Sequence, residues 1–379
     1  MKKICLIFIF ISVCAPTFSQ RQQFSFQKID SIAEVLSPLQ SSTITELAEF
    51  INVHFNTDSG KSRFIYSWIA THIRYDVDCY LGKNSNQQDA TTVFMFKQGV
   101  CSGYANLFAE LCRHCNILCM RIDGTCNKNH ISNHSWNAYK INDGWALADV
   151  TWAAGGVNDA NDFIPQFSDQ YFNVSPGLFI RDHFPDDPMW QLLLQPVTPS
   201  AFTANKILGD YQLQQGTFYF NDTIHHFLYL DSIHREEDSF RRSYAFNPGN
   251  KYLKEGRIST LMELSDQYLS VGDQYFNDYF KMKKNSFKQP GLFVQAEERI
   301  RTLLENANSY YQQIYQAYLT IPDSDDPYNK ASIQNNREVI NQRLYYLKVE
   351  LEFMGDYFSA SVSKRLEVLK SHPQMLQWW

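Results

Sequence analysis

Three stretches decide the fold of this chain: residues 99–105 (GVCSGYA), residues 134–137 (HSWN) and residues 145–152 (WALADVTW). In this order they supply a thiol at Cys101, an imidazole at His134 and a carboxylate at Asp149. Nucleophilic acyl transfer requires these three groups, because an imidazole must take the proton of the thiol and a third group must orient the imidazole. A single Cys, His or Asp is usually structural, so the prediction depends on the combination.

The residues around each group predict where it lies. Apolar residues recur at helical spacing after Cys101, which places the thiol at the N-terminus of a buried helix. The free amides and the positive end of the helix dipole favour a thiolate there. His134 and Asp149 lie in strand-like segments on either side of a turn at residues 142–144 (NDG). Adjacent antiparallel strands are about 4.8 Å apart, so Asp149 should accept from one imidazole nitrogen while the other faces Cys101.

These motifs resemble the transglutaminase-like superfamily, whose fold is related to that of papain. Upstream, residues 66–76 (YSWIATHIRYD) are similar to a family helix that ends in an IRYD turn. Downstream, residues 149–156 (DVTWAAGG) and the run 171–193 resemble the branch that contains kyphoscoliosis peptidase and its secreted bacterial relatives. The resemblance covers roughly residues 45–195.

The resemblance implies an α+β fold, a papain-like transglutaminase core in which the nucleophile helix packs on an antiparallel sheet. It also implies that Cys101 is the nucleophile, His134 the general base and acid, and Asp149 the orienting carboxylate. One oxyanion donor is expected at Gln88, or at Gln87 beside it, and the amide of Cys101 is expected to be the second.

Residues 1–19 are predicted to be a secretory signal peptide. Two lysines precede an apolar run from Ile4 to Ala15, and small residues follow near Ser19. The run is too short to span a membrane, and no later segment has about 20 consecutive apolar residues. We therefore expect a secreted or periplasmic chain without a transmembrane segment. The alternative is a lipoprotein anchored at Cys14, but Val13 before it is bulkier than such sites favour.

The composition is ordinary for a globular protein, with 44% hydrophobic and 20% charged residues. The formal net charge is −6, and no basic patch stands out along the chain. Nucleic-acid binding therefore has no support, and we expect no nucleic-acid partner.

Cysteine spacing superficially suggests a zinc site, through Cys112, Cys115, Cys119, Cys126 and His114. Cys112 and Cys115 continue the apolar face of the helix that follows Cys101, so buried small apolar side chains explain them better. We expect no metal and no cofactor. If Cys101 is free, an odd number of cysteines remains after the signal, so at least one more thiol is unpaired.

A length of 379 residues predicts two domains. Residues 20–198 are expected to form the catalytic domain with N-terminal helices, and residues 199–250 a short β-rich connector with a hairpin turn at Asn221 and Asp222. Residues 251–379 contain three long amphipathic patterns, which predict a mainly α-helical bundle domain. This bundle carries no catalytic pattern, so it is either a docking module or a structural appendage.

The leading hypothesis is a secreted cysteine enzyme that hydrolyses a peptide or isopeptide amide in a peptide or protein substrate, such as a cell-wall peptide. Transfer to a lysine amine would instead make it a crosslinking transglutaminase, and the triad does not distinguish the two reactions. Hydrolysis is favoured because the sequence suggests neither the calcium sites nor the accessory β-sandwiches of crosslinking relatives. The alternative from another class is a non-catalytic protein- or cell-envelope-binding module that retains the fold. The oligomeric state stays open.

Overall fold

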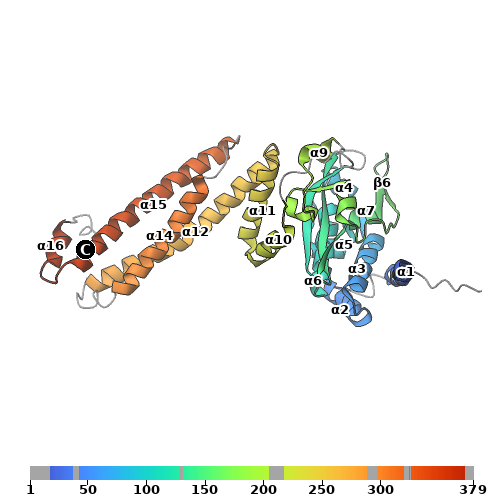
Figure 1. Ribbon diagram of the computed structural model, residues 1–379, viewed down its shortest axis with the longest axis horizontal. Coiled ribbons are helices and arrows are strands. Elements are labelled where there is room, and N and C mark those ends of the chain that lie inside the picture. The colour runs from blue at the N-terminus through green and yellow to red at the C-terminus, as the bar shows by residue number, and fades with distance from the viewer. Residues whose placement is uncertain are drawn as a thin grey trace, which may run out of the picture. The chain divides into compact units, whose positions relative to one another are not determined.

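The computed structural model describes residues 18–36, 42–127, 131–204, 217–287, 297–319, 324 and 326–371. The chain divides into two compact units after Phe220, unit 1 from blue to green and unit 2 from yellow to red in Figure 1. Residues 1–17 of the predicted signal peptide lie outside the described residues, and helix α1 (Phe18–Val35) follows them. Among the helices described, none is long and apolar enough to cross a membrane.

Unit 1 begins with α1, α2 (Ile44–His54) and α3 (Asp58–His72), of which α1 packs along α3. The Thr57 side chain accepts a hydrogen bond from the Gly60 amide and so caps the start of α3. Helix α3 is buried along most of its length, and the buried Arg63 within it forms an ion pair with the partly exposed Asp30 of α1 at 2.7 Å. The helix predicted from the residues before IRYD is therefore confirmed.

The segment after α3 leads back to the nucleophile. It comprises β1 (Arg74–Tyr75), α4 (Val77–Tyr80), α5 (Ala90–Phe96), β2 (Gln98–Gly99) and α6 (Cys101–His114). Strands β1 and β2 pair in parallel, and the Asp76 amide donates to the Gly99 carbonyl at 2.9 Å. The end of the IRYD turn is thus joined to the residue two positions before Cys101.

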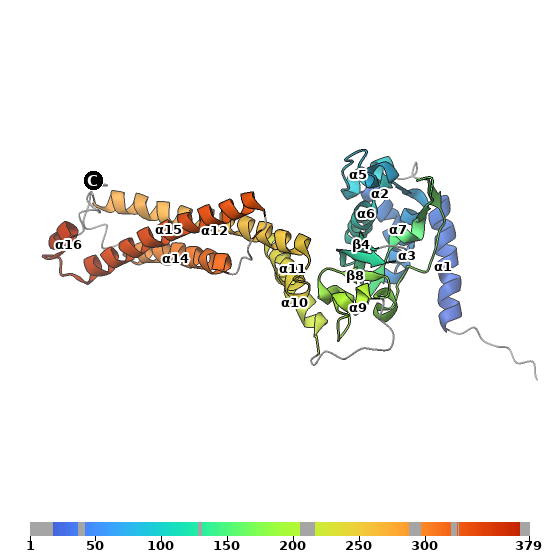
Figure 2. The same cartoon turned by 90° about the horizontal axis from the view of Figure 1, so that it is seen from above.

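Four antiparallel strands form the main sheet in the order β5-β4-β3-β8. They are β3 (Cys119–Asn127), β4 (Ile131–Ile141), β5 (Gly144–Ala148) and β8 (His183–Pro185), and α6 packs on β3 and β4 (Figure 2). The hairpin predicted at residues 142–144 is confirmed, with Asn142 in the left-handed region at a φ of 52°. The expected α+β core, with its nucleophile helix packed on an antiparallel sheet, is what the structure contains.

Shorter elements complete unit 1: α7 (Val150–Ala154), β6 (Gly155–Val157), β7 (Phe163–Pro165), α8 (Pro176–Phe179), the 3₁₀ helix η2 (Pro188–Gln191) and α9 (Pro199–Thr203). The core lies between α3, α6 and the sheet, where Trp68, Tyr104, Phe108 and Tyr139 are fully buried. These large side chains account for much of the apolar area removed from water in this unit.

Asp186 lies directly after β8, and its pKa makes the stability of unit 1 depend on pH. Burial, followed by the charges of Asp123 and Asp187, raises the pKa of Asp186 from 3.8 to about 7. The folded chain therefore holds a proton that the unfolded chain has already lost, so stability falls as the pH rises from about 4 to about 7.

We expect Asp186→Asn to remove this loss. The variant should match the wild type near pH 4 and exceed its unfolding free energy at pH 8 by on the order of 4 kcal/mol. Urea unfolding at the two pH values measures the difference, with the exposed Asp159→Asn as the matched control. An equal effect of Asp186→Asn at both pH values would contradict the assignment.

Unit 2 is helical throughout its described residues, as predicted for residues 251–379. It contains α10 (Phe220–Tyr229), α11 (Ser232–Phe246), α12 (Lys251–Phe287), α14 (Glu297–Leu319), α15 (Pro327–Ser359) and α16 (Arg365–Ser371). The long helices α12, α14 and α15 lie side by side (Figures 1 and 2). Their shared core includes Tyr311, Ile314, Ile340, Leu347 and Phe353, all fully buried.

The β-rich connector expected at residues 199–250 is wrong for the described part of that stretch, which forms α9, α10 and α11. Asn221 and Asp222 lie in the first turn of α10 instead of turning a hairpin, and an acidic residue there favours a helix start. Ile224 and Phe227 are spaced by three and buried, which is the helical pattern that the local alternation concealed. These helices also move the boundary between the units from residue 198 to residue 220.

Candidate active site

Cys101 is the first residue of α6 and is partly exposed. It is a free thiol, and Val100 before it offers no side-chain cap to the amides of the first turn. An uncapped helix N-terminus favours negative charge at this place, as the sequence predicted.

Gln88 holds the start of α6. Its side-chain oxygen accepts from the Val100 amide at 2.8 Å, and its Nε2 donates to the Asn86 carbonyl at 2.9 Å. The same Nε2 is directed at the sulfur of Cys79, at 3.6 Å. The amide predicted as an oxyanion donor is thus engaged in fixing the loop before the nucleophile, and Gln87 beside it is exposed.

Tyr75 of β1 is a polar group near the nucleophile that the sequence analysis did not assign. Burial, and after it the charge of Cys101, raise the pKa of Tyr75 well above its ordinary value. The phenol therefore stays a neutral hydrogen-bond donor. Tyr75 is the Tyr of the IRYD turn, and that motif was the signal in the sequence that could have identified it.

Gly103 leaves the space that Gln88 occupies. A Cβ at this position would lie 2.4 Å from the Gln88 Oε1 and 2.8 Å from a Val93 methyl group. Gln88 cannot move aside without losing its hydrogen bond to Val100, so we expect Gly103→Ala to cost about 1–3 kcal/mol and to slow alkylation of Cys101. Thermal unfolding and iodoacetamide kinetics measure both effects. Gly177→Ala, where a Cβ meets nothing within 4 Å, is the control, and equal behaviour of the two variants would contradict the role of Gly103.

His134 lies on β4 and is nearly buried, and Asp149 follows β5 at the N-cap of α7 and is fully buried. The Asp149 Oδ2 accepts from His134 Nε2 at 2.8 Å, while its Oδ1 accepts from the amides of Thr151 and Trp152 at 2.9 and 3.1 Å. The Trp152 ring stacks on the imidazole at a centroid distance of 5.3 Å. The structure thus brings the predicted imidazole and carboxylate together and fixes both.

The pKa values of His134 and Asp149 are shifted in opposite directions. Burial alone would lower the pKa of His134, but the charge of Asp149 and hydrogen bonds with Asp149 and Cys101 raise it well above its usual value. Burial alone would raise the pKa of Asp149, but the charges and hydrogen bonds of His134 and His183 hold it well below its usual range. An imidazolium next to the thiol and an ionised carboxylate behind it follow.

His183 is a member of the site that the sequence analysis did not assign. It is the first residue of β8, is fully buried, and places its Nε2 3.0 Å from the same Oδ2 of Asp149. In the sequence, His183 lies within the family-like run 171–193, which does not indicate its role. His183 lies 34 residues after Asp149, so no spacing along the chain predicts the contact.

Within the described residues, one group of three side chains has the donor atoms that a metal site would need: His134, Asp149 and His183, whose nitrogen and oxygen atoms lie within 4.8 Å of one another. Hydrogen bonds among these atoms account for the group. Cys112, Cys115, Cys119 and Cys126 are free thiols, and Cys112 and Cys115 are buried on the apolar side of α6 and its C-cap.

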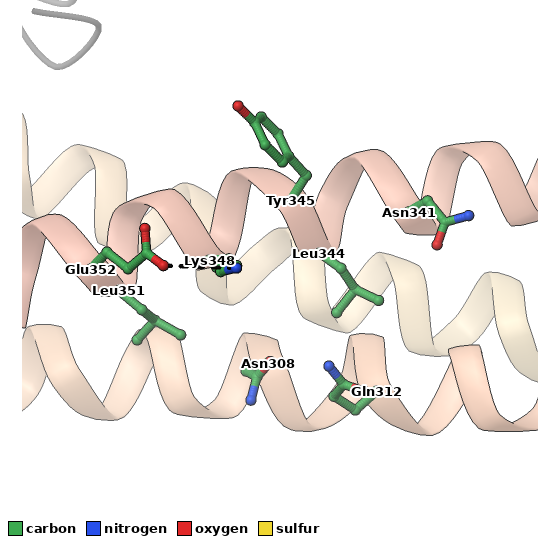
Figure 3. A pocket seen from close by; sticks show the side chains of 8 residues that line it. All are labelled: Asn308, Gln312, Asn341, Leu344, Tyr345, Lys348, Leu351 and Glu352. Atoms are coloured by element: carbon green, nitrogen blue, oxygen red, sulfur yellow. Dashed lines mark ion pairs between the residues drawn. The ribbon is translucent and has the colours of Figure 1, made fainter. Parts of the chain in front are cut away.

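A groove in unit 2 contains none of the triad residues. It has a volume of about 490 Å³ and lies between α14 and α15, where Asn308 and Gln312 face Leu344 and Leu351 (Figure 3). An ion pair between Lys348 and Glu352 at 3.8 Å lies along it. Tyr345 also lines this groove, beside its amide, aliphatic and paired charged side chains.

The family model of the transglutaminase-like superfamily matches residues 46–150, the interval that holds Cys101, His134 and Asp149. The chain carries a transglutaminase-like domain. The match spans α2 to the start of α7, so the helices and strands that position all three groups belong to it.

Similarity to curated proteins extends beyond this interval. The chain is 32% identical to human kyphoscoliosis peptidase over 190 residues, which are 48% of this chain and 28% of that protein, and equally identical to the mouse protein. It is 24% identical over 213 residues to the Caenorhabditis elegans Lim and transglutaminase domain protein ltd-1, covering 49% of this chain and 29% of that protein. The chain therefore matches less than a third of the length of these relatives.

Proposed function

We propose that this chain is a cysteine enzyme that transfers an acyl group through Cys101, His134 and Asp149. The observation that carries the proposal is the hydrogen-bonded series from Cys101 to His134 to Asp149, in which the pKa of the imidazole is raised. An imidazolium beside a thiol at a helix N-terminus favours the thiolate, which is the nucleophilic form.

The proposed reaction assigns one role to each group. The Cys101 sulfur attacks the amide carbonyl carbon and forms a C–S bond, while the carbonyl oxygen takes the electron pair. When the C–N bond breaks, the proton on the His134 Nδ1 goes to the leaving nitrogen, and a thioester remains. Water then gives a proton back to Nδ1 and attacks the thioester, the C–S bond breaks, and the thiolate and the acid are released.

We favour hydrolysis of a peptide or isopeptide amide over transfer to an amine. The relatives at 32% identity are named as peptidases, and the described part of unit 2 is helical and offers no β-sandwich. We also propose that the chain is exported, on the basis of the lysines and apolar run that begin its sequence.

The test is a screen of the full chain, with the signal segment removed, against peptide, isopeptide and cell-wall stem-peptide amides, each with and without a primary amine. Hydrolysis should release the free acid in both cases, and the amine should not change the product. Incorporation of the amine would overturn hydrolysis in favour of crosslinking. A Cys101 thiol that is alkylated no faster than Cys79 would overturn the enzymatic proposal and favour a binding module.

A further inference from the structure

His183 makes two hydrogen bonds to carboxylates and is enclosed by rings. Its Nε2 lies 3.0 Å from Asp149 Oδ2, and its Nδ1 lies 2.6 Å from Asp182 Oδ1. Phe179 stacks on the imidazole at a centroid distance of 4.0 Å, and Trp152 lies at 4.4 Å. The ring therefore has one fixed orientation, with each nitrogen against an acid.

These contacts indicate which nitrogens of the His183 ring donate hydrogen bonds. An ionised carboxylate only accepts hydrogen bonds, so a nitrogen that faces one must donate. Both nitrogens of His183 face carboxylates, and a ring that donates from both nitrogens is an imidazolium. Asp182, which is partly exposed, supplies a charge that balances it, and Asp149 lies between two imidazole rings.

The sheet register brings the two histidines together across β3. His134 on β4 pairs with Gly124, and His183 on β8 pairs with Cys126, two residues further along the same strand. Both therefore lie on the same face of the sheet, with β3 between them. Gly124 allows β8 to approach β3 closely, since a Cβ there would lie 2.3 Å from the Phe184 carbonyl and 2.8 Å from the Trp136 ring. The ring centroids of His134 and His183 are consequently 5.7 Å apart.

We propose that His183, held by Asp182, is a positioning residue for the acyl transfer proposed above. Its Nε2 fixes Asp149 Oδ2 in the place where it accepts from His134. Its positive charge keeps the buried carboxylate ionised after His134 has passed its proton to the leaving nitrogen. Without that charge, Asp149 would at that moment be a buried anion with only neutral partners, which is unfavourable.

Two substitutions separate the hydrogen bond from the charge. His183→Gln keeps an Nε2 donor within reach of Asp149 but is neutral, while His183→Phe keeps an aromatic ring among Phe179, Trp136 and Trp152 but cannot donate. His114→Gln is the matched control, because His114 lies at the C-terminal end of α6, far along the helix from Cys101. The titratable groups that face His134 are Cys101 of α6, Asp149 at the start of α7 and His183 of β8. Asp182 lies behind His183, and Tyr75 of β1 lies near Cys101.

The readout is the ring ¹⁵N spectrum of His134 in the full chain labelled with ¹⁵N-histidine, recorded against pH. In His183→Gln, the titration midpoint of His134 should rise by at least about half a pH unit, because a positive charge at 5.7 Å has been removed. In His183→Phe, the neutral His134 should lose its single tautomer with hydrogen on Nε2, and alkylation of Cys101 should slow at least about tenfold. His183→Gln should recover most of that rate.

A titration midpoint of His134 that stays at its wild-type value in His183→Gln would overturn the proposal, and this variant decides the question if His183→Phe does not fold. The spectrum needs no turnover, so the result is independent of the proposed function. A chain that hydrolyses none of the tested amides but shows these shifts would contradict the function and support the role of His183. Hydrolysis of an amide together with an unchanged His134 titration in His183→Gln would support the proposed function and contradict the role of His183.

Discussion

Replacing Cys101 with alanine is expected to abolish thiol-dependent turnover and leave the fold intact. The thiol is partly exposed at the first position of α6 and is absent from the core of unit 1. The contacts that hold this helix start come from the backbone of Val100 and from Gln88, and neither involves the sulfur of Cys101. The variant should therefore unfold at the wild-type temperature while losing all acyl transfer.

Cys79→Ala is the control for this result, because Cys79 is also a partly exposed free thiol in the same unit. It should retain both activity and the rapidly alkylated thiol. Residual turnover near the wild-type level in Cys101→Ala would remove Cys101 from the mechanism. A loss of activity that accompanies a lower unfolding temperature would point to a structural role instead.

Asp149→Asn should lower turnover by as much as about 10⁴-fold, the scale found when the carboxylate of another triad is neutralised. The Asn oxygen can still accept from the Thr151 and Trp152 amides, so the cap of α7 is kept. The amide nitrogen would then face the Nε2 atoms of His134 and His183, which also donate. His134 must give up its hydrogen on Nε2 or turn away, and either change removes the base from Cys101.

The measurement is kcat with the most rapidly hydrolysed amide, together with substrate affinity, which should change little. Asp89→Asn is the matched control, since Asp89 caps α5 through the Thr92 amide and lies outside the triad. A loss below about tenfold would mean that another group orients His134. Asp149→Ala should in addition destabilise unit 1 by about 1–2 kcal/mol through loss of the cap.

The core of unit 1 could be predicted because its signals are local. Helical spacing after Cys101 and the turn residues 142–144 each lie within a few residues of the element that they determine. The pairing of His134 with Asp149 also follows, since one hairpin carries both. Their roles in catalysis stay predictions until the variants above are measured.

The region after unit 1 was predicted less well because alternation over a short stretch does not distinguish a strand from part of a helix. Asp231 caps α11 through the His234 amide, and Asp326 caps α15 through the Tyr328 and Asn329 amides. The first of these caps was the local signal that separated helix from strand in residues 199–250. The long patterns of α12, α14 and α15 left no such ambiguity.

The parts of the site that the sequence did not reveal depend on contacts between distant segments. His183 reaches Asp149 only because β8 pairs with β3 next to Gly124. Gln88 was expected to donate to an oxyanion, but the Val100 amide fixes its oxygen and Asn86 takes its amide hydrogen. Both outcomes require the folded positions of at least two elements, which spacing along the chain does not contain.

The parallel pairing of β1 with β2 has a consequence for how the segment before Cys101 could vary in length. Because Arg74 and Asp76 bond to Lys97 and Gly99, the segment of residues 77–97 starts and ends at neighbouring points. The second half of this segment is held by hydrogen bonds of Asn86 to Asp76 and of Gln88 to Val100. Residues 82–85, which lie between Asp76 and Asn86 in the chain, are exposed. Insertions there would lengthen a surface loop that precedes Cys101 in the chain without moving the helix that carries the thiol. The length of this loop and the position of the helix that carries Cys101 thus depend on separable parts of the chain.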